Sequence, residues 1–318
     1  MFGDSMKKNI LDYLQNNRDR HMSGNAISKE LGISRAAVWK QICNLRREGY
    51  RINARPNCGY RLEEEPDRLN KDLLEERGIM YYREVDSTNL VARRLAEEGY
   101  PSYTTVIAEE QLQGRGRLGR DWFSPACSGL WFSVVLRPEK ITLANAAPVT
   151  LVTAAALANN LKNRQGLAVK IKWPNDLLIN AKKFGGILSE VKGEPDRIEY
   201  LIIGVGLNVN QQADDFPADL KKQATSLLVE SGRAFDRTSL FLSLWENLCR
   251  AYDLFMEEGF TPFRESLLAY QSFLGREVKV TWSGGTLVGL AVDLDRDGSL
   301  LVKDKKGAVQ RIYYGEIE

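Results

Sequence analysis

Residues 114–120 read Gly-Arg-Gly-Arg-Leu-Gly-Arg and are the stretch of this chain best suited to bind an anion. Glycine lets the backbone adopt positive φ and approach a ligand closely. The three arginines, Arg115, Arg117 and Arg120, offer paired N–H donors that match phosphate or carboxylate oxygens. Trp122 follows directly and is expected to enter a core and tether the loop. The pattern predicts a mobile anion clamp, although a solvated basic turn or a nucleic-acid contact explains the loop alone equally well.

Further polar segments lie at the ends of predicted strands. Asp-Ser-Thr-Asn at 86–89 follows a strand and precedes a helix, so it could cap that helix or bind a small polar head group. Lys-Trp-Pro-Asn-Asp at 172–176 ends a buried strand, where a simple turn is a sufficient explanation. Lys183 opens a glycine-containing strand that a ligand could approach closely. Gly-Val-Gly-Leu-Asn at 204–208 precedes no obvious helix and is weak as a dinucleotide fingerprint.

Together these segments describe a site that is rich in anion binders and lacks a nucleophile. His21 is the only histidine, which nearly excludes a catalytic histidine triad and a multi-histidine metal site. The four cysteines, Cys43, Cys58, Cys127 and Cys249, are widely spaced, which argues against a zinc site and fits a reducing cytoplasm. Such a site would catalyse by alignment and charge neutralisation, as in nucleotidyl transfer from ATP to a carboxylate.

The charges separate a basic N-terminal segment from an acidic remainder. Residues 1–62 contain 12 Lys and Arg against 5 Asp and Glu, whereas the whole chain has a net charge of only +2. The N-terminal segment is therefore expected to meet a polyanion, and the acidic remainder disfavours a general nucleic-acid enzyme with a basic loop. The sequence has no signal-peptide pattern and no uninterrupted apolar run of spanning length, so we expect a cytoplasmic protein.

The first 62 residues have the pattern of a winged helix-turn-helix. A helix at 26–31 ends in glycine, and Ser34 can cap a second helix over 35–48. Short strands at 51–55 and 59–62 would then form a basic hairpin. A helical cap domain with a solvated charged face is the alternative, but the order of turn, cap, basic helix and basic hairpin favours DNA binding. The expected DNA contacts are Ser34, Arg35, Lys40, Arg46 and Arg55.

The remaining sequence predicts two further domains and an α+β multidomain fold. An acidic linker with a proline places the first boundary near residue 65, so that residues 1–65 form the winged helix-turn-helix domain. Residues 66–271 alternate between helical and apolar β-rich runs and predict one mixed α/β domain, including a buried helix at 143–162. Residues 272–318 contain four or five short strands with tight turns and predict a small SH3-like β-barrel.

In their order and separation these motifs resemble those of the biotin protein ligases. The matching motifs are Asp-Ser-Thr-Asn, Gln-x-x-Gly-Arg-Gly-Arg-x-Gly-Arg-x-Trp, Lys-Trp-Pro-Asn-Asp, Lys-x-x-Gly-Ile and Gly-x-Gly-x-Asn. With the winged helix in front, essentially the whole chain resembles the bifunctional biotin ligase/biotin-operon repressors of bacteria, the BirA family. The central domain would then have the biotin/lipoate ligase fold.

The resemblance implies a reaction in two steps. Biotin and Mg-ATP would first give biotinyl-5′-AMP and pyrophosphate. A lysine on the biotin carboxyl carrier domain of an acetyl-CoA or pyruvate carboxylase would then attack the adenylate. The resemblance also implies that the adenylate is a corepressor, which favours a homodimer on the operator DNA of biotin-synthesis genes.

The resemblance assigns site residues one by one. The implied biotin-binding residues are Ser87, Thr88, Asn89, Gln111, Gly114, Arg115, Gly116, Arg117, Lys183 and Gly186. The implied ATP- or adenylate-binding residues are Arg115, Arg117, Arg120, Trp122, Asn175 and Asn208. The implied catalytic residues are Lys183, Arg117 and Asp176, with Lys183 neutralising developing charge and Asp176 positioning the reacting groups or the incoming lysine. The spacing predicts no metal site of the protein's own, and Mg²⁺ would arrive with ATP, near Asn208.

Two rival functions remain open on the sequence. Lipoate ligases share the central fold, but their Arg-Arg and triple-glycine pattern is not found here. A transcriptional regulator that senses biotin without catalysis should lack a complete adenylation set. Arg115, Arg117, Asp176 and Lys183 are all present, which favours the ligase.

Overall fold

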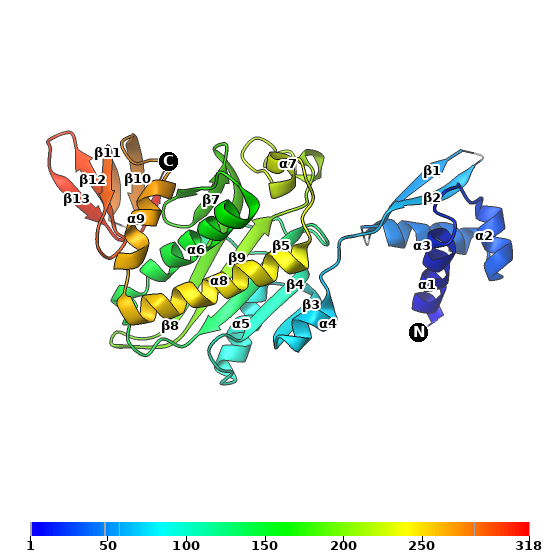
Figure 1. Ribbon diagram of the computed structural model, residues 1–318, viewed down its shortest axis with the longest axis horizontal. Coiled ribbons are helices and arrows are strands. Elements are labelled where there is room, and N and C mark those ends of the chain that lie inside the picture. Colours follow the sequence, from blue (N-terminus) through cyan, green and yellow to red (C-terminus); the bar gives the residue numbers. More distant parts are fainter. Residues whose placement is uncertain (1, 48, 57, 283, 318) are drawn as a thin grey trace. The chain divides into compact units, whose positions relative to one another are not determined.

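The computed structural model describes residues 2–47, 49–56, 58–282 and 284–317 and divides the chain into two compact units (Figure 1). The first unit is Met1–Arg68 and the second is Leu69–Glu318. Residue 48 of the predicted recognition helix and residue 57 of the predicted hairpin turn lie outside the described residues. Among the helices that the structure describes, none has the length and apolar character needed to cross a membrane.

The first unit is a three-helix bundle with a β-hairpin, and it confirms the predicted winged helix-turn-helix. Its elements are α1 (Phe2–Gln15), α2 (Gly24–Leu31), α3 (Arg35–Arg47), β1 (Arg51–Arg55) and β2 (Gly59–Glu64). The turn between α2 and α3 follows from local chemistry. Gly32 ends α2 in the left-handed region at φ 65°. The Ser34 hydroxyl then accepts a hydrogen bond from the Ala37 amide at 3.1 Å and starts α3. Apolar residues of all three helices and both strands form the core: Ile10, Leu14, Ile27, Val38, Ile42, Leu45, Ile52 and Leu62.

The second unit is built on a seven-stranded sheet of order β3-β4-β5-β9-β8-β7-β6, in which β3 and β4 are parallel and all other neighbours are antiparallel. The strands are β3 (Ile79–Val85), β4 (Thr105–Gln111), β5 (Gly129–Leu136), β6 (Lys170–Lys172), β7 (Asp176–Ile179), β8 (Lys182–Glu194) and β9 (Arg197–Asn208). Every residue of β5 is buried, because both faces of the sheet are covered by helices.

The two faces of the sheet carry separate apolar clusters. Helices α6 (Pro148–Gln165) and α8 (Arg237–Glu258) lie side by side over one face, and α5 (Thr88–Glu97) packs against the other (Figure 1). The shorter helices are α4 (Lys71–Glu76), α7 (Leu227–Ser231) and α9 (Thr261–Tyr270). The buried helix predicted over 143–162 in fact begins at Pro148, after a 3₁₀ turn at Leu143–Asn145. Proline favours the first helical position because its φ is already helical and its missing N–H is not needed there.

The C-terminal segment forms a five-stranded antiparallel sheet of order β13-β12-β11-β10-β14. Its strands are β10 (Glu277–Trp282), β11 (Gly285–Leu294), β12 (Leu300–Asp304), β13 (Val309–Ile312) and β14 (Glu316–Ile317). Its buried side chains belong to the same apolar cluster as those of α6 and α8. The indole Nε1 of Trp173 also donates to the Gly298 carbonyl at 3.1 Å. The C-terminal sheet is therefore packed against the central part of the second unit.

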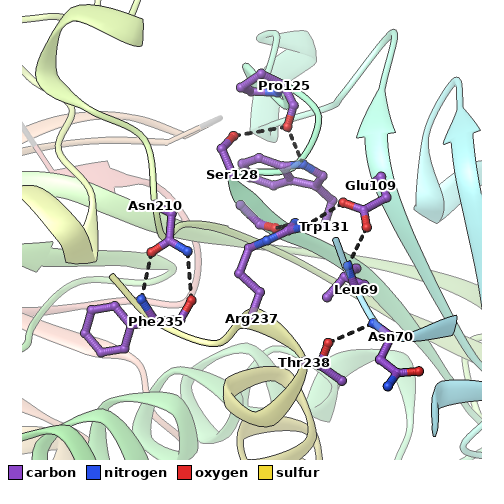
Figure 2. A network of polar contacts seen from close by, with 11 residues as sticks. Leu69, Asn70, Glu109, Pro125, Ser128, Trp131, Asn210, Phe235, Arg237 and Thr238 are labelled. Atoms are coloured by element: carbon purple, nitrogen blue, oxygen red, sulfur yellow. Dashed lines mark hydrogen bonds and ion pairs between the residues drawn. The ribbon is translucent and has the colours of Figure 1, made fainter. Parts of the chain in front are cut away.

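A buried ion pair ties the start of the second unit to the seven-stranded central sheet (Figure 2). The Arg237 guanidinium contacts the Glu109 carboxylate at 2.8 Å, and the two side chains are 0% and 3% exposed. The other Glu109 oxygen accepts from the Leu69 amide at 2.6 Å, and Arg237 also donates to the Gly129 carbonyl at 2.8 Å. A buried charge is tolerated only when it is paired and hydrogen-bonded, so this network holds β4, β5, α8 and residue 69 together.

Candidate active site

The predicted site residues meet in one cavity of about 300 Å³. Of the residues predicted to bind biotin or ATP or to act in catalysis, the cavity is lined by Ser87, Thr88, Asn89, Gln111, Arg115, Gly116, Arg117, Arg120, Trp122, Asn175, Asp176, Lys183, Gly186 and Asn208. Gly114 does not line it but shapes the loop that does. The cavity has the size of a small-molecule site and a mixture of apolar walls and convergent polar groups.

The floor of the cavity is a pair of glycines beneath a tryptophan. Gly186 of β8 and Gly206 of β9 are paired in register. A Cβ added at Gly206 would come within 2.4 Å of Trp122 Nε1, and one at Gly186 within 3.1 Å of the same ring. The indole therefore lies against bare backbone, which only glycine permits. Trp122 Nε1 is itself buried without a hydrogen-bond partner among the described residues.

One end of the cavity is a closed set of neutral hydrogen bonds around Gln111. Its Oε1 accepts from the Thr88 amide at 2.9 Å and from the Thr88 hydroxyl at 3.1 Å. Its Nε2 donates to the Ser124 hydroxyl at 2.9 Å. Ser87 stands at the start of α5 without a side-chain capping bond, so capping does not account for its hydroxyl. This end can hold a small polar group by hydrogen bonds rather than by charge.

Asn89 supports this end from behind. Its Oδ1 lies 2.7 Å from the Ser133 hydroxyl, and its Nδ2 donates to Glu190 at 3.1 Å. A Cβ added at Gly204 of β9 would come within 2.0 Å of Asn89 Oδ1. The oxygen and the nitrogen of the amide thus both make contacts within the protein, which fix Asn89 as part of the wall at this end.

The glycine- and arginine-rich segment at residues 114–120, called the anion loop below, folds back on itself as a tight turn. The Gly116 amide donates to the Arg120 carbonyl at 2.7 Å, and the Trp122 amide donates to the Gly114 carbonyl at 2.8 Å. A Cβ at Gly114 would lie 2.4 Å from the Trp122 carbonyl oxygen, so the glycine is required by this close approach. Leu118 at the tip has φ 56° and is 75% exposed. The loop has a defined shape, while its tip contributes little apolar burial.

The loop arginines contact the C-terminal tail at the other end of the cavity. Arg117 donates to Asn175 Oδ1 at 2.9 Å and to the Gly315 carbonyl at 3.0 Å. Arg120 forms an ion pair with Glu316 at 2.7 Å. Burial lowers the pKa of the Arg117 guanidinium from its ordinary value, while Glu316 and Asp176 oppose that shift. The guanidinium remains a cation, and its partial removal from water strengthens its attraction for an anion.

Lys183 and Asp176 form the second charged contact of the cavity. Lys183 Nζ lies 2.7 Å from Asp176 Oδ1 and 5.1 Å from the centre of the Trp122 ring. The Lys183 backbone is fixed by a hydrogen bond from its amide to the Gln223 carbonyl at 2.8 Å. An ammonium held between a carboxylate and an aromatic face, and beside the loop arginines, can neutralise charge on a bound carboxylate or phosphate.

Asn208 lines the cavity but is engaged within the protein. Its Nδ2 donates to the Thr225 carbonyl at 3.0 Å, and its Oδ1 accepts from Gln211 at 3.3 Å. Within the described ranges, no group of three or more His, Cys, Asp or Glu side chains is placed to hold a metal ion.

The other lining residues were given no individual role from the sequence, although residues 172–174 and 204–206 lie within recognised motifs. They are Asp121, Phe123, Lys172, Trp173, Pro174, Ile187, Leu188, Gly204, Val205, Gly206, Phe216, Leu220, Gln223, Ala224, Glu316 and Ile317. Some of these adjoin a recognised motif, which was a usable signal. Phe216, Leu220 and Glu316 carry no such signal, because they reach the cavity only through the folding of distant segments.

The predicted DNA-contacting residues occupy different positions in the first unit. Arg35, Lys40 and Arg55 are exposed, the first two on α3 and the third at the end of β1. The Ser34 hydroxyl caps α3, and the Arg46 guanidinium donates to the Ile52 carbonyl at 3.0 Å. Arg46 thus ties α3 to the hairpin, and its contact with DNA remains a prediction.

Comparisons with known proteins cover all three parts of the chain. An HTH domain model matches residues 7–61, the Biotin/lipoate A/B protein ligase family matches residues 81–208, and the Biotin protein ligase C terminal domain matches residues 273–318. The bifunctional ligase/repressor BirA of Bacillus subtilis is 37% identical and covers 99% of this chain and 98% of its own length. The bifunctional ligase/repressor BirA of Escherichia coli is 33% identical, and the match covers 93% of this chain and 92% of the Escherichia coli protein.

The same similarity is seen in structure. The biotin protein ligase from Aquifex aeolicus in complex with biotin and ATP superposes with a TM-score of 0.67 at 32% identity. It covers 76% of this chain and 97% of its own.

Proposed function

The chain belongs to the family of bifunctional biotin ligase/repressors, and from this we propose that it activates biotin with ATP, transfers it to a protein lysine, and represses transcription. One observation carries the proposal. Side chains implied to bind biotin, to bind phosphate and to act in catalysis come from separate segments between Ser87 and Asn208 and line a single cavity. The end around Ser87, Thr88 and Gln111, the neutral end, suits the ureido ring of biotin. The end that holds Arg117, Arg120 and Lys183, the cationic end, suits the carboxylate and the phosphates.

In the first step, a carboxylate oxygen of biotin attacks the α-phosphorus of ATP. A new P–O bond forms, the bond to the β-phosphate oxygen breaks, and pyrophosphate leaves. Lys183, held 2.7 Å from Asp176, neutralises the charge that gathers on the carboxylate and the α-phosphate. The backbone hydrogen bonds of the loop hold Arg115 and Arg117 near these groups. Because the loop is already ordered, less conformational entropy is lost when the reactants bind.

Binding of ATP exchanges the partners of the loop arginines. Arg117 and Arg120 are held by the Gly315 carbonyl and the Glu316 carboxylate, and the phosphate oxygens of ATP replace these acceptors. Trp122 forms part of the wall beside the adenylate. Mg²⁺ bound to ATP would reduce the negative charge of the phosphates that Arg117 and Arg120 then meet.

In the second step, the amine of an acceptor lysine attacks the carbonyl carbon of biotinyl-5′-AMP. An amide bond forms, the amine proton is lost, and AMP leaves. Asp176 stands beside Lys183 and positions the incoming amine. The acceptor is the biotin carboxyl carrier domain of an acetyl-CoA or pyruvate carboxylase.

The repressor function uses the first unit. Biotinyl-5′-AMP that is not consumed acts as corepressor by stabilising the form of the second unit that makes a homodimer. Two recognition helices are then presented to the operator DNA of biotin-synthesis genes, as a palindromic site requires. A protein with these activities is expected to work in the cytoplasm.

The proposal is tested by exchange of labelled pyrophosphate into ATP in the presence of biotin. Exchange that requires biotin and does not occur with lipoate is the expected result. Exchange with lipoate instead would keep the mechanism and replace the substrate. No exchange with either acid would mean that the second unit senses its ligand without adenylating it.

A further inference from the structure

Trp39 is the most exposed tryptophan of the chain. It lies on α3 with 61% of its surface exposed. The other five tryptophans are buried or partly buried, with Trp131 and Trp173 at 0% and 2%. A large aromatic side chain that stays in water does not gain the free energy of burial. Such a side chain often marks a binding surface, because a partner can bury it.

The neighbours of Trp39 define the kind of partner that suits it. Arg35 and Ala36 lie four and three residues before it on α3, and Lys40 follows it; all three are exposed. Residues three and four apart share one face of a helix, so Arg35 and Ala36 lie beside the ring, while Lys40 is its exposed neighbour in sequence. The side of α3 that faces the core holds the buried Val38 and Ile42, and Trp39 lies at the edge of that side. A protein-binding patch would extend its apolar surface, whereas this one is surrounded by positive charge.

Further along α3, several of the described side chains make contacts within the unit. Arg46 donates to the Ile52 carbonyl of the hairpin, and Asn44 donates to Gln41 Oε1 at 3.1 Å. The free side chains of the described part of α3 therefore gather in its N-terminal half. In helix-turn-helix proteins this half of the recognition helix contacts base edges in the major groove. Trp39, one turn into the helix, is in this half.

We propose that Trp39 contacts the 5-methyl groups of thymines in the major groove and makes the DNA preference of the chain depend on thymine. The inference rests on the proposed repressor function. The thymine methyl is the apolar group that base edges present in that groove, and apolar side chains recognise it. Double-stranded DNA also supplies the negative charge that Arg35 and Lys40 require. The basic balance of residues 1–62, 12 Lys and Arg against 5 Asp and Glu, agrees with this partner.

The test begins with duplex DNA selected from a random-sequence pool by the full-length chain in the presence of biotin and ATP. Each thymine of the selected duplex is then replaced singly by uracil, which removes the methyl group and leaves base pairing intact. Wild-type affinity should fall about fourfold at each contacted thymine, the value of one buried methyl. The Trp39→Ala variant should bind the parent duplex more weakly, and its affinity should no longer respond to uracil.

Two further variants make this result specific. Trp39→Phe keeps an aromatic ring and should retain part of the uracil response. Lys40→Ala is the matched control: it should weaken binding to the thymine and uracil duplexes equally and lower the salt dependence by about one phosphate contact. Because the Trp39 side chain is largely exposed, Trp39→Ala should unfold at the wild-type temperature.

The possible failures are distinguishable. If the wild-type chain enriches no DNA sequence, the proposed repressor function fails and the inference fails with it. If it binds its selected duplex but uracil has no effect, or if Trp39→Ala responds to uracil as the wild type does, only the inference is overturned. Normal DNA binding by Trp39→Ala together with lost self-association would assign this face to a protein contact instead.

Discussion

The two ends of the cavity are held together by different forces. At the neutral end, Ser87, Thr88 and Asn89 are 2%, 3% and 4% exposed, and the amides of Gln111 and Asn89 are bonded within the protein. At the cationic end, the Arg120 side chain is 67% exposed and its partner is a carboxylate of the last strand. Buried hydrogen bonds are costly to break, whereas exposed ion pairs exchange partners easily. The first end can select its ligand by shape, and the second can close over phosphates.

The buried pair behind the neutral end should give the largest effect on stability. Glu109 lies two residues before Gln111 on β4, and Arg237 holds the first carbonyl of β5. Arg237→Met leaves the Glu109 charge buried without its partner, so we expect the free energy of unfolding to fall by about 3–5 kcal/mol. Denaturant unfolding measures this. The matched control is Glu109→Gln with Arg237→Met, which should be less harmful. Equal losses would show that the charge is not the cause.

Loss of the ammonium at the cationic end should have a large effect on rate and little on stability. We expect Lys183→Ala to lower kcat/KM for adenylate formation by about 10²- to 10³-fold, the usual effect of removing one group that stabilises developing charge. Pyrophosphate exchange measures the loss. DNA binding by the ligand-free chain and the melting temperature are the controls. Unchanged turnover would remove Lys183 from the mechanism.

A methyl group at the neutral end should separate biotin binding from ATP binding. Gly204→Ala places a Cβ 2.0 Å from Asn89 Oδ1, which cannot move freely because it is bonded to Ser133 and Glu190. We expect about 1–3 kcal/mol of lost stability and a higher KM for biotin. The KM for ATP should change little. If both values rise together, the two ends are coupled and the contrast between them is wrong.

The tail contact should give the smallest effect, and in the opposite direction. Glu316→Gln removes the charge that competes with phosphate for Arg120. We expect the KM for ATP to fall by about two- to fivefold at low salt and the difference to shrink at high salt. The KM for biotin and the melting temperature should not change. A higher KM for ATP would mean that Glu316 holds the loop in its binding shape instead of competing.

The sequence predicted much of this contrast, but not its cause. The residues assigned to ligand binding or catalysis were recognised at both ends, and all of them except Gly114 line the cavity. One residue of the Asp-Ser-Thr-Asn segment was expected to cap the following helix, yet Ser87 at the N-cap position makes no side-chain capping bond. The contacts of Arg117 with Gly315 and of Arg120 with Glu316 join residues almost 200 positions apart, and no local pattern could indicate them. The buried Glu109–Arg237 pair escaped prediction for the same reason.

The amino-acid sequence by itself determined the features that depend on neighbours within a few residues. These include the capped turn before α3, the glycines of the anion loop and the alternation of helices and strands, since caps, φ preferences and apolar periodicity act over one or two turns. Only the tertiary structure decided which acceptors hold the arginines, why Asn89 and Asn208 are engaged, and that Trp39 is left in water. The contacts of the arginines and of the two asparagines depend on the order of strands in the central sheet, which brings distant segments to one cavity. The exposure of Trp39 depends instead on which residues of α3 pack into the core of the first unit.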